Sequence, residues 1–91
     1  MLRCEDRIVA SDDVLSATID GELVLMRLAS GNYFSFRDVS VDIWQRIAEP
    51  QQVSSLCAAL IASYDAPEER IRNSVAKFLN ELLQHGLIRV L

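Results

Sequence analysis

The sequence predicts an α+β domain in which a three-stranded antiparallel meander is followed by three helices. In the first half of the chain, two turn signals, Asp20-Gly21 and Ala29-Ser30-Gly31, separate apolar runs of alternating character. In the second half, apolar residues recur at spacings of three and four, which is the helical period. Strands followed by helices predict helices packed on one face of a small sheet.

The two turns define the strands. Asp20-Gly21 fits a two-residue hairpin loop, because both loop positions need a positive φ that Gly and Asp tolerate. This loop joins a strand expected at residues 14–19 to one at residues 22–28. The second turn supplies a glycine for a left-handed position and leads into a third strand at residues 32–36.

The third predicted strand has a distinctive composition. Its side chains alternate, so Phe34 and Phe36 point to one face while Tyr33 and Ser35 point to the other. As the last strand of a meander it has a free backbone edge, and it carries no Lys, no Pro and no inward charge. Its composition therefore does not discourage pairing with another strand.

Two helices are predicted between residues 38 and 64. Asp38 can cap the first, which Pro50 ends. The second spans about residues 52–64 and carries one continuous apolar stripe. The apolar positions are Val39, Ile43, Trp44 and Ile47 in the first helix and Val53, Leu56, Cys57, Leu60, Ile61 and Tyr64 in the second.

A third helix is predicted from Asp65 to His85. Asp65 can cap it, Pro67 suits its first turn, and Glu68 completes a capping box. Gly86 supplies the left-handed residue that ends it. Its apolar positions are Ile71, Val75, Phe78, Leu79, Leu82 and Leu83.

The length of 91 residues suits one domain with a modest core. We expect residues 1–13 to form an N-terminal segment that could be flexible, and residues 14–91 to form the domain. Residues 87–91 are expected as a short extended tail.

Charge and composition exclude several classes of function. The net charge is −4 and the nine basic residues are scattered, whereas phosphate binding depends on clustered Lys and Arg. This argues against nucleic acid as a partner. The charged N-terminus and the lack of a long apolar stretch indicate neither a signal peptide nor a membrane partner, so we expect a cytoplasmic protein. Cys4 and Cys57 lie far apart in the sequence, as in a reduced protein.

Candidates for catalysis are few. His85 is the only histidine, and its place in the last turn of a helix suits hydrogen bonding to exposed carbonyls. Cys57 lacks a basic neighbour and Trp44 has core spacing, so both are expected in the core. No glycine-rich phosphate loop appears. We therefore predict no enzyme, no catalytic residue, no metal site and no cofactor.

The third helix could supply an apolar wall for a peptide strand added to the free edge. At about 100° per residue, Phe78 lies at the margin of the apolar arc, beside Ser74, Lys77, Glu81 and His85. One aromatic residue among small and charged ones suits the rim of a groove. The alternative is that Phe78 is plain core and its polar neighbours are merely solvated.

Several short motifs occur in a fixed order over about residues 14–90. They are Gly31 with Tyr33 and Phe34, Ile43 with Trp44, Tyr64 with Asp65, and Leu82 to Ile88. In this order, the chain resembles the PqqD-like family, the leader-peptide-binding domains known as RiPP precursor recognition elements.

The resemblance implies a winged-helix-like domain that performs no chemistry. It implies that the leader of a ribosomally made precursor peptide adds as a strand beside the third strand, in a groove toward the third helix, and is delivered to a partner enzyme. The chain lacks the Tyr-Pro-Glu-Gly stretch of pyrroloquinoline quinone biosynthesis members, and has Phe36-Arg37 where many relatives have Leu-Asn. It looks more like the stand-alone proteins of lasso-peptide clusters, which work with a leader peptidase and an ATP-dependent cyclase.

We therefore expect the peptide-binding residues on the third strand and the third helix, with Arg70 and Lys77 facing acidic leader residues and Glu81 facing basic ones. The expected residues are Leu28, Asn32, Tyr33, Phe34, Ser35, Phe36, Arg70, Ser74, Lys77, Phe78 and Glu81.

Two alternatives stay open. A winged-helix DNA-binding regulator would share the fold class, although the second predicted helix contains no Lys or Arg. A homodimer could also form if the edge strand paired with its own copy.

Overall fold

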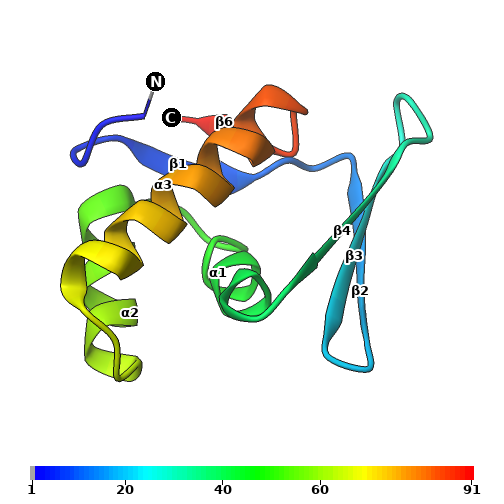
Figure 1. The fold of residues 1–91 in the computed structure, drawn as a ribbon. Coiled ribbons are helices and arrows are strands. Elements are labelled where there is room, and N and C mark those ends of the chain that lie inside the picture. The colour runs from blue at the N-terminus through cyan, green and yellow to red at the C-terminus, as the bar shows by residue number, and fades with distance from the viewer. Residues whose placement is uncertain (1) are drawn as a thin grey trace.

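The computed structural model describes residues 2–91 and contains two three-stranded antiparallel sheets and three helices (Figure 1). One sheet is the predicted meander, formed by β2 (Val14–Ile19), β3 (Glu22–Arg27) and β4 (Tyr33–Arg37) in that order. Asp20 and Gly21 have φ angles of 51° and 76°, which confirms the hairpin turn. We call this the meander sheet.

The second sheet joins the two ends of the chain, and we call it the terminal sheet. It consists of β1 (Arg7–Ala10) between β5 (Gln51–Gln52) and β6 (Ile88–Val90). Ile8 pairs with Val90 and is fully buried. The prediction of a single sheet was therefore incomplete, because β1 lies in the N-terminal segment and the C-terminal tail forms β6.

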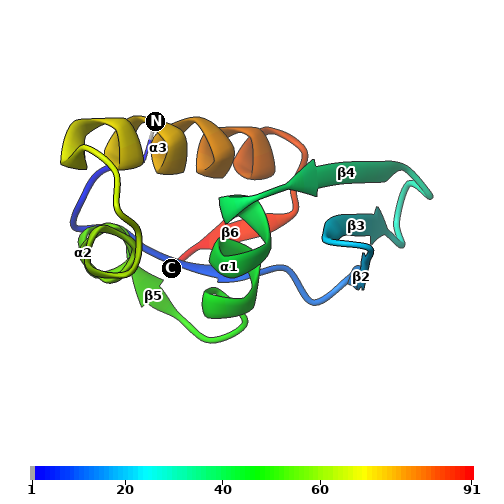
Figure 2. The same ribbon diagram turned by 60° about the horizontal axis from the view of Figure 1, so that its bottom comes forward.

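Three helices follow the meander as predicted: α1 (Val39–Arg46), α2 (Val53–Ser63) and α3 (Glu68–Gln84). They cover the terminal sheet, while the meander sheet projects to one side of them (Figure 1). In the second view, β4 lies beyond the C-terminal end of α3, with the end of the strand that leads into α1 nearest to the helix (Figure 2). Within residues 2–91, no helix combines the length and the apolar character that crossing a membrane requires.

The predicted N-cap of α3 was wrong, and that of α1 was right in position only. Asp38 occupies the N-cap position of α1, with φ 61° and ψ −128°, but its side chain makes no capping hydrogen bond; the backbone N–H of Val41 donates to the Asp38 carbonyl at 3.2 Å. Pro67 occupies the N-cap position of α3, so Asp65 lies too early to cap it and no capping box with Glu68 forms. These helix starts depend on packing rather than on side-chain caps.

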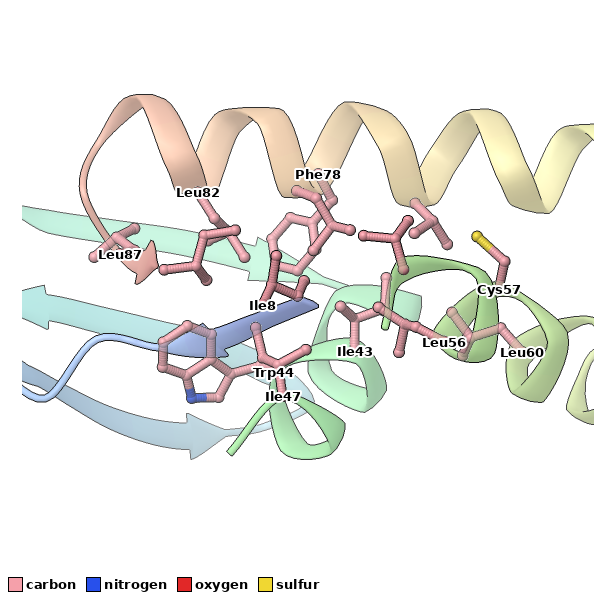
Figure 3. Close-up of a cluster of buried hydrophobic side chains, with 14 of the residues drawn as sticks. Ile8, Ile43, Trp44, Ile47, Leu56, Cys57, Leu60, Phe78, Leu82 and Leu87 are labelled. Carbon is pink, nitrogen blue, oxygen red and sulfur yellow. The ribbon is translucent and has the colours of Figure 1, made fainter. Parts of the chain in front are cut away.

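One continuous core connects the helices with both sheets (Figure 3). Trp44 and Cys57 are buried in it, as predicted. From the meander sheet, only Leu23 and Leu25 on β3 are fully enclosed. Most of the meander sheet therefore remains available to solvent or to a partner.

The C-terminal end of α3 is tied to the meander sheet by one arginine. Gly86 ends the helix with φ 71°, as predicted. The guanidinium of Arg27 on β3 donates from Nη1 to the His85 carbonyl at 3.2 Å, and its Nε lies 3.5 Å from the Asp13 carboxylate. A cation suits the partial negative charge of a helix C-terminus. This contact helps to hold β3 and β4 at a fixed distance from α3.

Candidate functional site

β4 has a free backbone edge, because the meander sheet ends with it in residues 2–91. The N–H of Arg27 donates to the carbonyl of Asn32 at 3.1 Å, which makes these two residues a hydrogen-bonded pair. Hydrogen-bonded and non-hydrogen-bonded pairs alternate along an antiparallel ladder. The backbone groups of Tyr33, Ser35 and Arg37 therefore point away from β3, toward the free edge.

The face of β4 that looks toward α3 is aromatic. The Phe36 ring meets the Phe78 ring of α3 edge to face, with 4.8 Å between centroids and 74° between planes. The Phe34 ring lies 4.6 Å from the His85 ring at a tilt of 42°. Offset and edge-to-face arrangements are the favoured geometries of aromatic pairs. β4 and α3 are thus joined by a floor of aromatic side chains.

A hollow of about 250 Å³ lies above this floor. The C-terminal end of β4, the start of α1 and one side of α3 form its walls. Its lining residues are Phe36, Arg37, Asp38, Val39, Ser40, Ser74, Lys77, Phe78 and Glu81.

A second hollow, of about 220 Å³, continues along α3 toward its N-terminal end. It shares Val39 and Ser74 with the first hollow and is also lined by Tyr64 and Arg70. We call the two hollows together the β4–α3 groove. The groove therefore begins beside a free strand edge and extends past it between two helices.

A fixed tyrosine borders the far end of the groove. The Tyr64 hydroxyl donates to the Asp42 carboxylate at 2.9 Å, and this hydrogen bond raises the pKa of Tyr64 because it favours the neutral phenol. Arg46 in turn holds Asp42 at 2.7 Å. Tyr64 therefore presents a neutral, positioned ring to the groove.

The charges around the first hollow are mixed. Arg37 and Lys77 stand beside Asp38 and Glu81. A surface that binds a phosphate backbone needs clustered charge of one sign. The groove can instead make short-range contacts to both positively and negatively charged side chains of a bound peptide.

The structure brings most of the predicted residues together. Phe36, Ser74, Lys77, Phe78 and Glu81 all line the first hollow, and Phe78 is part of the core as well as the rim. The two readings of Phe78, core residue and groove residue, are thus compatible, and Phe34 extends the floor toward His85.

Other predicted residues lie outside the groove or contribute only their backbone. Leu28 is exposed in the turn after β3, where its N–H donates to the Asp13 carbonyl on the β2 side of the sheet. Asn32 is paired with β3. The side chains of Tyr33 and Ser35 point to the opposite face of the sheet, so only their backbone groups reach the free edge.

Sequence reasoning missed the contribution of the loop and helix that follow β4. Asp38, Val39 and Ser40 close one end of the first hollow. The sequence signal was the immediate succession of strand and helix at residues 37–39, which forces the start of α1 to lie beside the end of β4.

Two other candidates, a metal site and a hollow on another face of α3, both have fewer features of a binding site than the β4–α3 groove. Within residues 2–91, no three His, Cys, Asp or Glu side chains gather closely enough to hold a metal ion. A further hollow of about 250 Å³ lies on another face of α3, where Cys4 and Cys57 both line it. That hollow is lined by apolar residues together with Arg3, Arg72, Asn73 and Asn80, and none of these lining residues belongs to a strand.

Comparison with known proteins identifies the family. The profile of "Coenzyme PQQ synthesis protein D (PqqD)" matches residues 22–88, which include the meander from β3 onward and all three helices. The chain belongs to the PqqD family. Among curated proteins, none matches the chain.

Two solved structures share the fold of this PqqD-family chain. One, described as "TbiB1 in Complex with the TbiA(beta) Leader Peptide", is 31% identical, with a TM-score of 0.79 over 89% of this chain and 94% of that one. The other is "Lasso peptide synthetase B1 complexed with the leader peptide". It is 20% identical, with a TM-score of 0.76 over 90% of this chain and 96% of that one, and shows the fold alone. The predicted family and α+β fold class are confirmed.

Proposed function

We propose that this PqqD-family chain binds the leader segment of a ribosomally made precursor peptide and delivers it to an enzyme that modifies the peptide or cleaves its leader. The observation that carries the proposal is the free edge of β4 beside the β4–α3 groove. The similarity to TbiB1, solved in complex with a leader peptide, supports it. The similarity to a lasso peptide synthetase B1 fold favours lasso peptide biosynthesis as the setting.

The leader adds to the sheet as an extended strand. Its backbone exchanges hydrogen bonds with the outward N–H and C=O groups of Tyr33, Ser35 and Arg37. Such main-chain bonds provide affinity, while pockets for alternate side chains provide specificity. Alternate leader side chains enter the first hollow and rest on Phe36 and Phe78.

Charged residues at the rim adjust recognition. Arg70 and Lys77 favour acidic leader residues and Glu81 favours basic ones. Exposed charge pairs of this kind change the encounter rate and specificity more than the affinity. The chain itself performs no chemistry under this proposal, and the partner enzyme supplies the reaction.

A fluorescence-polarisation titration tests the proposal. The probe is the labelled leader segment of the precursor peptide encoded beside this chain, and we expect micromolar or tighter affinity. Replacing Ser74, which lies where the two hollows meet, by Trp should fill the groove and weaken binding at least about tenfold, or 1.4 kcal/mol.

The matched control is Ala76→Trp, because Ala76 lines the hollow on the other face of α3. It should leave the affinity unchanged. A scrambled leader should bind weakly. Equal binding of the native and scrambled leaders, or equal affinities for the two Trp variants, would contradict recognition in this groove.

A further inference from the structure

The meander sheet has a second free edge, on the side away from β4. Within residues 2–91, β2 pairs with β3 alone, and five of its six residues are exposed. The strand, Val14-Leu15-Ser16-Ala17-Thr18-Ile19, contains no charged residue, no Pro and no Gly. Natural sheets usually protect an edge with such residues or cover it. An uncharged, unprotected edge therefore indicates a pairing surface.

The structure defines which backbone groups of β2 are available. The N–H of Leu28 donates to the carbonyl of Asp13 at 2.8 Å, so residue 13 belongs to a pair bonded toward β3. Alternation along the ladder places the backbone groups of every second residue on the opposite side. Val14, Ser16 and Thr18 therefore direct their N–H and C=O groups toward solvent.

Within β2, the side chains of residues 15–19 are symmetric about Ala17. Ala17 is flanked by the hydroxyl residues Ser16 and Thr18, and beyond them by Leu15 and Ile19. Leu15 and Ile19 are 54% and 59% exposed and lie on the outer face of the sheet together with Ala17. Across residues 15–19, an antiparallel copy of this strand thus places a hydroxyl residue opposite a hydroxyl residue and an apolar residue opposite an apolar residue.

From this symmetry we propose that β2 binds β2 of a second copy of the chain, antiparallel and with Ala17 opposite Ala17. In this register Ser16 and Thr18 of the two copies exchange backbone hydrogen bonds, since both point to the free edge. Leu15 lies opposite Ile19 on the outer face, in a non-hydrogen-bonded pair whose side chains approach closely. The contact is isologous and closes at a dimer.

Other registers compatible with the free edge are poorer. A pairing centred on Ser16 places Ile19 opposite Asp13, whose carboxylate is already paired with Arg27, and it places Leu15 opposite Ala17. The Ala17 register places Val14 opposite Asp20, but Asp20 lies in the hairpin turn beyond the end of the strand. The Ala17 register is the one that joins the two exposed large apolar residues. It also leaves β4 and its groove untouched, because β4 lies at the other edge of the sheet.

Sedimentation velocity of the full chain, over a range of concentrations, tests the dimer. The unmodified chain should show a concentration-dependent species of twice the chain mass. Ala17→Lys alone and Ala17→Glu alone should each be monomeric, because two like charges then face each other at Cα atoms about 4.5 Å apart. Ala17 is exposed, so neither substitution should disturb folding.

Mixing the two variants in equal amounts is the decisive step. The mixture should recover a dimer, because Lys of one copy then faces Glu of the other, and each variant serves as the control for its partner. A monomeric unmodified chain at every concentration, or a dimer that survives both single substitutions, would overturn the proposal. Leader affinity measured in parallel should be the same for all these proteins, so that a failure here is separable from a failure of peptide binding.

Discussion

The two edges of the meander sheet differ in what stands beside them. Both β2 and β4 present three residues whose backbone groups point outward. β4 contacts the C-terminal part of α3 through aromatic side chains and shares a groove with it, whereas β2 is exposed on both faces. Backbone groups alone supply hydrogen bonds to any strand. We therefore expect the groove beside β4 to select a specific peptide, and we expect β2, which has no groove beside it, to pair with a strand whose side chains match its own.

Proline substitutions should have the largest effects, because one at the edge of β4 should weaken only leader binding and one at the edge of β2 should prevent only dimerisation. Ser35→Pro removes an outward N–H of β4 and places a ring where the leader backbone would lie, while the ladder to β3 is kept. We expect leader binding to weaken by at least about thirtyfold, or roughly 2 kcal/mol, in a polarisation titration. Ser35→Ala, which keeps the N–H, is the matched control.

Thr18→Pro makes the same change at the edge of β2. It should abolish the dimer in sedimentation experiments and leave leader affinity unchanged. If Thr18→Pro weakened leader binding as much as Ser35→Pro did, the two edges would not have separate functions.

A substitution at Gly86 should weaken leader binding at β4 by an intermediate amount and leave dimerisation through β2 unchanged. Its φ of 71° disfavours a side chain, and an added Cβ would lie 2.5 Å from Nη1 of Arg27. Gly86→Ala should therefore lower stability by about 1–2 kcal/mol and displace Arg27 from the His85 carbonyl. Because this contact helps to fix the distance from β4 to α3, thermal unfolding and leader affinity should both fall. Dimerisation through β2 should not change, and a selective loss of the dimer would contradict this.

The smallest expected effect concerns Glu22, whose carboxylate accepts hydrogen bonds from Ser35 and Arg37 on the outer face of β4. These contacts lower the pKa of Glu22, first through the Ser35 hydroxyl. A carboxyl whose pKa is lower in the folded state stabilises it above the unfolded pKa, and this contribution is lost as the pH falls through the folded value.

An NMR pH titration can check this. Ser35→Ala should raise the pKa of Glu22 toward its usual range and change leader affinity less than about twofold, because the pair is exposed. An unchanged pKa would contradict the assigned cause.

The local parts of the fold were predictable because they depend on neighbouring residues. Asp20 and Gly21 take the positive φ angles that their turn type needs. Four of the six residues of the predicted apolar stripe of α2 are buried, while Ile61 is partly buried and Tyr64 is exposed. The terminal sheet was not predictable, because the pairing of β1 with β6 joins residues about eighty positions apart. The sequence of a four-residue strand such as β1 does not indicate which other strand it pairs with.

The groove was predictable in part for the same reason. Helical spacing placed Ser74, Lys77, Phe78 and Glu81 on one margin of α3, and the structure places them in one hollow. The contribution of α1 depended on the path of the chain through Asp38, whose positive φ is unusual for a residue other than Gly. Asp38 occupies the predicted N-cap position, but in this conformation, which is not the extended one usual for an N-cap, its side chain makes no capping hydrogen bond.

The most direct test of leader recognition is amide hydrogen exchange, measured by NMR with and without the leader. Strand addition to β4 predicts an alternating result: new protection at the N–H groups of Tyr33, Ser35 and Arg37, and little change at Phe34 and Phe36, which already bond to β3. No added protection along β4, or protection of Ser16 and Thr18 on β2 instead, would contradict the account.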